Sequence, residues 1–398
     1  MRILSICVIV FCTTLVVMAQ QSSESKQAEK KWFDKISLRG YTQVRYNRLL
    51  ETNAQLKCEQ CDRSIGDNGG FFIRRARLIF SGQVSDNVFI YIQPDFASTA
   101  TDLHFAQLRD AYFDLSLDSL REFRFRIGQS KIPYGFENLQ SSQNRLPLDR
   151  SDALNSAVPN ERDLGVMFYW APAHTRKLYS DLVSKGLKGS GDYGVLGLGV
   201  HNGQTTNKPE TNNTPHIVAR LSYPWEVAGQ IIEVGLQGYS GRIAPLSSTT
   251  GVAKVADYLD ERTAVSIALA PQPIGLLAEY NWGHGPRFIA AKDTTEKNRV
   301  SDGTIEGGFA TLFYKIDAGG QHFIPFVRAQ YYKGGKKQEL DARYYDMKEV
   351  EFGVEWQAIS SFELTATYVI SERNTSDAAK IANNQKGNFL RLQAQFNY

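Results

Sequence analysis

Apolar and polar side chains alternate in strand-length runs from residue 36 to the end of the chain. In residues 122–128, one face carries three apolar side chains and the other carries two arginines: Phe123, Phe125 and Ile127 against Arg124 and Arg126. A period of two residues is typical of a β-strand, because successive side chains point to opposite faces of a sheet. The pattern therefore predicts an all-β protein.

We count sixteen runs of this kind. They span residues 36–47, 71–81, 87–96, 108–117, 122–128, 162–170, 193–201, 216–223, 230–242, 259–270, 274–283, 304–316, 322–333, 344–357, 362–372 and 388–398. The pattern is weaker in the second half, where glycine and small residues dilute it. Arg74 falls on the apolar face of its run, which predicts either a membrane-edge arginine or a β-bulge.

The polar faces of the early runs are rich in arginine, as Arg75 and Arg77 show. Arginines behind an apolar face would be badly placed in the core of a β-sandwich. They fit the wall of a membrane barrel, whose outside meets lipid and whose inside meets water. We therefore predict a transmembrane antiparallel β-barrel of about 16 strands.

The connectors between the runs support this fold. Odd-numbered connectors are long and most even-numbered ones are short, as in outer-membrane barrels with long external loops and short periplasmic turns. A secreted β-sandwich that binds a surface or a carbohydrate has no reason to sort its loops in this way. The exception is the connector 171–192, which predicts either a missed strand or an insertion.

The third external loop, the connector 129–161, is long and polar. Because it joins two wall strands, we expect it to fold into the lumen and narrow the pore. It should start beside the strand of Arg124 and Arg126 and face Arg75 and Arg77.

The two ends of the chain predict export to the outer membrane of a Gram-negative bacterium. Residues 1–19 have the features of a cleaved signal peptide, because the apolar run is short for a retained anchor helix and a polar stretch follows it. Residues 20–35 form a charged periplasmic linker, and residues 36–398 form the barrel. The last strand ends on Tyr398, as the closing strands of bacterial outer-membrane proteins end on an aromatic residue, and it is expected to engage the barrel-assembly machinery.

Composition excludes several classes of protein. The formal net charge of +3 gives no sign of nucleic-acid binding, so we expect no nucleic-acid partner. No segment after residue 19 approaches the ~20 apolar residues of a membrane helix, and the mean hydropathy is −0.33.

After residue 19, the only cysteines are Cys58 and Cys61, for which a small loop disulfide is favoured over half of a metal site or a redox pair.

The chain resembles the phosphate-selective porin O and P family. The resemblance rests on Arg74-Arg-Ala-Arg77, Asp110-Ala-Tyr112, Ile127-Gly-Gln-Ser-Lys-Ile-Pro-Tyr-Gly135, Arg162-Asp-Leu-Gly-Val166 and the terminal strand. It implies a homotrimer of sixteen-stranded barrels in outer-membrane lipid, each with an inward third loop and an arginine-lined anion pathway. Family selectivity for phosphate also depends on lysines around the pore, and Lys131 matches these.

The candidate pore-lining and anion-binding residues are cations of the inner faces and of the third loop. They are Arg39, Arg45, Arg75, Arg77, Arg124, Arg126, Lys131, Arg145 and Arg150, and further inward arginines are Arg220, Arg328 and Arg391. A guanidinium group stays charged and grips phosphate or carboxylate in a fork. The alternative is a merely polar interior, in which arginines pair with Asp95, Asp110, Asp114 and Glu122.

These patterns predict a porin for passive diffusion of small anionic solutes, with phosphate and polyphosphate as candidates. A general non-selective porin is the alternative, and a barrel hydrolase or surface binding protein is a further one. We expect neither catalysis nor a cofactor or metal, because the sequence has no catalytic motif and its six histidines are scattered.

Overall fold

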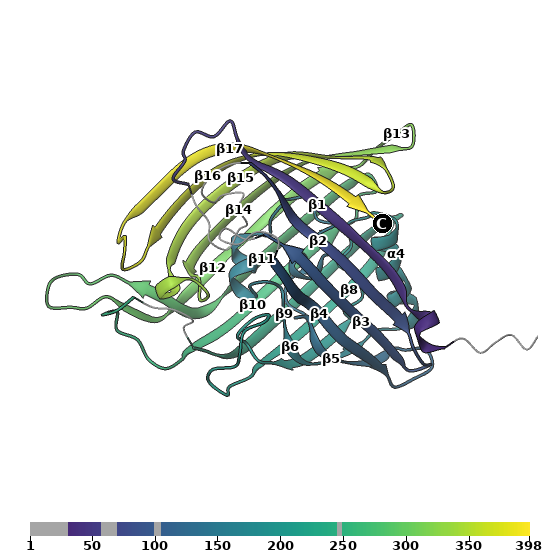
Figure 1. Ribbon diagram of the computed structural model, residues 1–398, viewed down its shortest axis with the longest axis horizontal. Coiled ribbons are helices and arrows are strands. Elements are labelled where there is room, and N and C mark those ends of the chain that lie inside the picture. The colour runs from purple at the N-terminus through teal and green to yellow at the C-terminus, as the bar shows by residue number, and fades with distance from the viewer. Residues whose placement is uncertain (1–30, 57–69, 99–104, 245–248) are drawn as a thin grey trace, which may run out of the picture.

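The computed structural model describes residues 31–56, 70–98, 105–244 and 249–398. Its strands form one closed antiparallel barrel (Figure 1). They are β1 Ser37–Leu49, β2 Gly70–Gln83, β3 Val88–Ala97, β4 Phe105–Ser116, β5 Phe123–Lys131, β6 Arg162–Trp170, β7 Leu196–His201, β8 His216–Val227, β9 Gln230–Ile243, β10 Tyr258–Leu269, β11 Ile274–Ile289, β12 Arg299–Tyr314, β13 Ile316–Ala318, β14 Gln321–Gly335, β15 Tyr344–Ile359, β16 Phe362–Ser376 and β17 Asn383–Asn397. Because β13 continues β12 along β14, the wall has the sixteen strands expected from the sequence.

The barrel closes between the first strand and the last. β1 pairs with β17 in the register Tyr41↔Asn397, and the backbone of Tyr398 bonds to Gly40 in both directions, at 2.6 and 3.0 Å. Closure removes both sheet edges, so the backbone polar groups of every wall strand are paired within the wall, as a lipid environment requires. The prediction that the terminal strand closes the barrel is confirmed.

The outer face of the wall is apolar and aromatic. Phe96, Leu312 and Phe352 are among the large hydrophobic side chains that remain exposed, whereas their neighbours in sequence are buried or half-buried. Such a surface is stable only against lipid or another apolar surface.

Arg74 lies in a β-bulge. Gln43 pairs with Arg75 and Val44 pairs with Ile73, so that Arg74 is the extra residue of β2. Of the two explanations for its parity, the bulge is the one that the structure shows.

The weak alternation of the second half has a structural cause. On β12, Leu312 faces outward and is 53% exposed, but the inward-facing Phe309 and Phe313 are also apolar and are buried. They belong to a hydrophobic cluster inside the barrel that includes Phe136 and Leu154 of the third loop. Strands that are apolar on both faces lose the period-two pattern.

Long and short connectors alternate around the barrel as predicted. Figure 1 shows the long loops toward one end and the short turns, the C-terminus and the helix α4 toward the other. In the connector 171–195, α4 (Ala173–Ser184) fills what would otherwise be a short turn, so this connector is an insertion and contains no missed strand. We call residues 171–195 the α4 insertion.

The N-terminal linker ends in a short 3-10 helix, η1 (Trp32–Lys35), immediately before β1. None of the helices in the described part of the chain is both long and apolar enough to cross a membrane. The predicted signal peptide, most of the linker, and Cys58 and Cys61 lie outside the described residues.

Candidate functional site

The third loop, residues 132–161, lies inside the barrel. It carries two short helices, α2 (Phe136–Leu139) and α3 (Asp152–Ala157), whose residues are all buried. α3 packs against β11, β12 and β14, on the wall opposite the strands from which the loop starts. The loop therefore crosses the lumen, as its position in the sequence predicted.

Ion pairs hold the loop to distant strands. Three acidic loop residues pair with wall arginines: Glu137 with Arg328 (3.0 Å), Asp149 with Arg45 (3.4 Å) and Asp152 with Arg373 (3.0 Å). A second loop also reaches Asp152, through the ammonium group of Lys336. Because each pair joins different strands, the loop is held from several sides at once.

A cluster of cations surrounds Glu161 at the end of the loop. Its carboxylate lies 3.5 Å from Lys131, 2.9 Å from Arg145 and 3.1 Å from Arg150, and it also pairs with Arg162. Burial alone would raise the pKa of Glu161, but these cations hold it well below its usual range. The carboxylate therefore stays ionised at neutral pH and ties the loop to β5 and β6.

Acidification is expected to loosen this attachment. Since the folded-state pKa of Glu161 is below its unfolded value, the group contributes stability above about pH 4.3, which is lost as the pH falls through the folded-state pKa. Urea unfolding at neutral and acidic pH, followed by tryptophan fluorescence, would measure the loss. Glu161→Gln should be less stable at neutral pH and should show a shallower pH dependence, and an unchanged pH profile would contradict this role.

Lys131 has no donor left for an anion. Its ammonium group donates to the carbonyl oxygens of Asn138, Leu139 and Gln140 at 3.0, 3.0 and 2.8 Å, and an ammonium has only three protons. In this geometry Lys131 holds the loop, which differs from the role that the family resemblance implies.

Arg150 also serves the loop. Its guanidinium donates to the side-chain oxygens of Asn138 and Asn155, at 2.7 and 2.5 Å, and to the carbonyl of Val158 at 3.2 Å. Arg145 adds a bond to the Gln140 carbonyl at 3.3 Å. The two loop arginines among the candidate residues therefore shape the constriction from within.

Four of the wall arginines line β2 and β5. Three of them form ion pairs: Arg77 with Asp95 (2.9 Å), Arg124 with Asp192 (2.8 Å) and Arg126 with Asp114 (2.7 Å). Arg77 also donates to the hydroxyl of Ser142 in the third loop, at 3.0 Å. The expected pairing with Asp95 and Asp114 thus occurs, whereas Glu122 accepts a bond from the backbone of Ala173 in α4 instead.

Arg75 is the exception among them. It is buried, it donates to the side-chain oxygen of Gln43 at 2.8 Å, and no acidic residue of the described chain pairs with it. Its electrostatic neighbours include Arg74, Arg77 and Arg45, all of the same sign. Arg75 is therefore a buried guanidinium whose charge no carboxylate of the described residues matches.

Arg39 does not lie with the other candidate residues. It is exposed at the start of β1, next to the residue that bonds to the C-terminus. Its inward parity therefore stands as a prediction, but parity does not report how far along the barrel a residue lies, and Arg39 lies near the end with the C-terminus.

The two halves of the wall differ in charge. β1–β6 carry eight buried cations and four buried acids, whereas β7–β17 carry five buried cations and seven buried acids. The third loop lies between these surfaces. The lumen of the described structure is therefore positive on one side and mildly negative on the other.

Several charged residues of the interior were missed in the sequence. Arg109 has outward parity, but a bulge opposite Pro94 turns it inward, and the proline was the available signal. Arg373 lies one residue beyond its predicted strand. Lys336 and Lys337 belong to an external connector, and nothing in their local sequence indicates that the connector folds inward.

Comparison with known proteins assigns the chain to a family. The model of the family described as phosphate-selective porin O and P matches residues 54–398, nearly the whole chain. The chain belongs to this porin family. No curated protein sequence matches it.

Solved structures similar to the porin are outer-membrane channels. The outer membrane channel DcaP of Acinetobacter baumannii superposes with a TM-score of 0.53 at 15% identity, over 91% of this chain and 97% of that one. OmpF of Salmonella typhi, solved with daunomycin, gives 0.55 at 12% identity, over 92% and 98%. An anion-selective porin from Comamonas acidovorans gives 0.50 at 9% identity, over 91% and 99%. At these identities the likeness shows the fold, and with the family it places the porin in the Gram-negative outer membrane.

The porin is thus a channel built on a barrel with an inward third loop. In its described part, no group of three or more histidine, cysteine, aspartate or glutamate side chains has the arrangement to hold a metal ion. At the end with the short turns, a cavity of about 1010 Å³ opens between the third loop, the α4 insertion and the turn after β15, and Lys185, Lys188 and Lys315 line it.

Proposed function

We propose that the porin conducts small anionic solutes, with phosphate-like oxyanions as candidates, along the positive wall formed by β1–β6. The observation that carries the proposal is the excess of buried cations on these strands together with the unmatched guanidinium of Arg75. The anion selectivity named for the Comamonas acidovorans porin is in keeping with it.

The constriction is what gives such a charge excess an effect. Two unit charges 4 Å apart interact by about 1 kcal/mol in bulk water and by about 4 kcal/mol at the lower effective dielectric constant of a protein surface. The third loop confines a permeating ion to a narrow path, where several charges act on it together. In a wide mouth, salt at physiological strength would screen the same charges.

A general non-selective porin is the second candidate, and one observation favours it. The described residues include seventeen buried arginines and lysines and an equal number, seventeen, of buried aspartates and glutamates. If an ion samples the whole interior, these charges cancel. The proposal of anion selectivity therefore depends on the distribution of charge and not on its sum.

Planar-bilayer recording in a salt gradient separates the two. An anion-preferring pore shifts the reversal potential toward the anion equilibrium potential, and a general pore leaves it near zero. Competition of phosphate with chloride current then tests whether oxyanions are preferred.

Replacing Arg75 with glutamine is expected to reduce the anion preference, since it removes the unmatched positive charge and keeps a hydrogen-bonding side chain. The matched control is Arg39→Gln, which removes an arginine from the exposed start of β1 and should leave the reversal potential nearly unchanged. Equal shifts in the two variants would indicate that only net charge matters and would argue against a site at Arg75.

We further propose that the porin acts without catalysis, as a homotrimer in outer-membrane lipid, and that β17 is recognised by the barrel-assembly machinery. The apolar outer wall supports the lipid environment, and the position of Tyr398 in the closing seam supports the recognition of β17. Purified porin should give conductance without hydrolase or protease turnover, and unheated samples should migrate on gels as trimers.

A further inference from the structure

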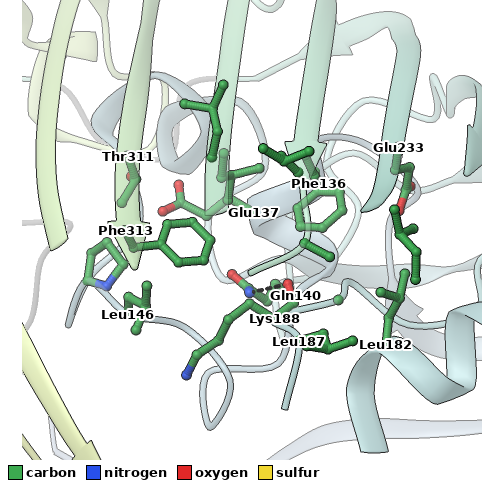
Figure 2. Close-up of a pocket in the computed structure, with 18 residues that line it drawn as sticks. Phe136, Glu137, Gln140, Leu146, Leu182, Leu187, Lys188, Glu233, Thr311 and Phe313 are labelled. Atoms are coloured by element: carbon green, nitrogen blue, oxygen red, sulfur yellow. Dashed lines mark hydrogen bonds between the residues drawn. The ribbon is translucent and has the colours of Figure 1, made fainter. Parts of the chain in front are cut away.

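A cavity inside the barrel differs in character from the charged wall. It has about 540 Å³ of empty space, part of it open to solvent, between the third loop, the α4 insertion and β9–β12, and most of its lining is apolar (Figure 2). Phe136 and Leu146 come from the third loop, Leu182 and Leu187 from the α4 insertion, and Ile231 and Phe313 from the wall. Since barrel interiors are usually polar, this apolar lining calls for an explanation.

Apart from Oε1 of Glu137, which pairs with Arg328 at 3.0 Å, two buried polar atoms at this cavity have no partner among the described residues. They are the hydroxyl oxygen of Thr311 and one carboxylate oxygen of Glu233, on side chains that are each at least nine-tenths buried. Figure 2 shows the two residues on opposite sides of the cavity. Buried polar groups almost always have a partner, so these atoms mark places where a bound molecule would complete the bonding.

The charges that line the cavity are already matched within the chain. The other oxygen of Glu233 accepts from Arg220 (2.8 Å) and Ser222 (2.5 Å), and Lys188 pairs with Glu355 (2.6 Å). Glu137 pairs with Arg328 across the lumen. A charged ligand would bring a charge without a counter-ion into an apolar site, which is strongly unfavourable.

We propose that this cavity binds a small uncharged apolar molecule that carries a hydroxyl group, such as an aromatic or aliphatic alcohol. The apolar body packs against the phenylalanine and leucine side chains, and the hydroxyl bonds to Thr311 or to the carboxylate of Glu233. Because the third loop and the α4 insertion each supply one wall of the cavity, an occupant binds the two segments together. This site goes beyond the proposed anion pathway and does not depend on it.

Binding of benzyl alcohol to the full-length porin, measured by saturation-transfer NMR in detergent, tests the proposal. Ala268→Phe fills the cavity and serves as the blank for partition into detergent. Wild type should bind benzyl alcohol above this blank and should bind benzoate and benzylammonium about tenfold more weakly or less. Equal signals from wild type and Ala268→Phe, or tighter binding of either ion, would overturn the proposal.

A second variant tests the polar contact. Thr311→Val should weaken the binding of benzyl alcohol by about 3- to 10-fold. The binding of ethylbenzene, which lacks the hydroxyl, should be unchanged. Thr367→Val is the matched control, because Thr367 is also a buried threonine without a partner for its hydroxyl in the described structure, but it does not line the cavity. A loss as large in Thr367→Val, or an equal loss for ethylbenzene, would overturn the assignment. Heat-modifiable migration on gels verifies that each variant has folded.

Discussion

Replacing Asp152 with alanine is expected to lower the free energy of unfolding of the porin by about 3–5 kcal/mol. The carboxylate is buried between Arg373 (3.0 Å) and Lys336, and its removal takes a carboxylate from two buried cations at once. Arg373 then keeps Glu349 at 2.9 Å, and Lys336 keeps Glu339 at 3.8 Å. Burial alone would raise the pKa of Asp152, but these two cations hold it well below its usual range, so the carboxylate is ionised at neutral pH. Urea titration with tryptophan fluorescence, at a constant lipid or detergent composition, measures the loss.

The matched control is Asp181→Ala. Asp181 also bridges two cations, Lys177 and Lys185, at 2.9 and 3.2 Å, but on the exposed face of α4. Exposed pairs contribute little, so this variant should be nearly as stable as the wild type. If both variants lose the same small amount, the third loop is not held by Asp152.

Changing Arg75, Arg77, Arg124 and Arg126 together to alanine is expected to abolish the anion preference and to turn it toward cations. The change removes four of the eight buried cations of β1–β6 and leaves Asp95 and Asp114 without these partners. The wall would then present carboxylates where it had presented guanidinium groups. Reversal potentials in a salt gradient, with the ratio of anion to cation conductance, report the change.

The corresponding four arginine-to-lysine changes keep the charge and remove the forked geometry. If selectivity comes from the charge of the wall, the lysine variant keeps most of the wild-type reversal potential; if it requires bidentate contact, the lysine variant loses selectivity for oxyanions but not for chloride. An alanine variant that keeps the wild-type reversal potential would show that these arginines are structural and that the porin is non-selective.

The wall of the barrel was predictable because each strand carries its own signal. Residues 122–128 alternate so regularly that lipid-facing and lumen-facing side chains can be told apart without a structure. The strand β5 (Phe123–Lys131) forms at this place in the chain. The strands β11 and β12 were harder to delimit. They run several residues beyond their predicted ends at 283 and 304, because polar side chains such as His284 remain on the outer face above the apolar band.

The candidate site also has a part that the sequence predicted and a part that it did not. The inward parity of Arg75, Arg77, Arg124 and Arg126 could be read from the sequence, and so could the inward path of the third loop. The hydrogen-bond and ion-pair partners of these cations could not be read from the sequence. Lys131 donates its three protons to loop carbonyls, whereas Arg75 lacks a carboxylate partner in the described structure. Both facts depend on how the chain folds and on which residues then meet.

By itself, the sequence determined the antiparallel barrel, its sixteen strands, the sorting of its loops and the face on which each wall arginine lies. All of these follow from the two-residue period of a strand and from local turn lengths. Only the tertiary structure decided which cations are matched, where the α4 insertion lies, and that the inner faces of β9–β12 line an apolar cavity. The physical reason is that burial and pairing inside a barrel arise between strands and loops separated by up to hundreds of residues, as in the pair of Asp149 with Arg391, and no local pattern records such contacts.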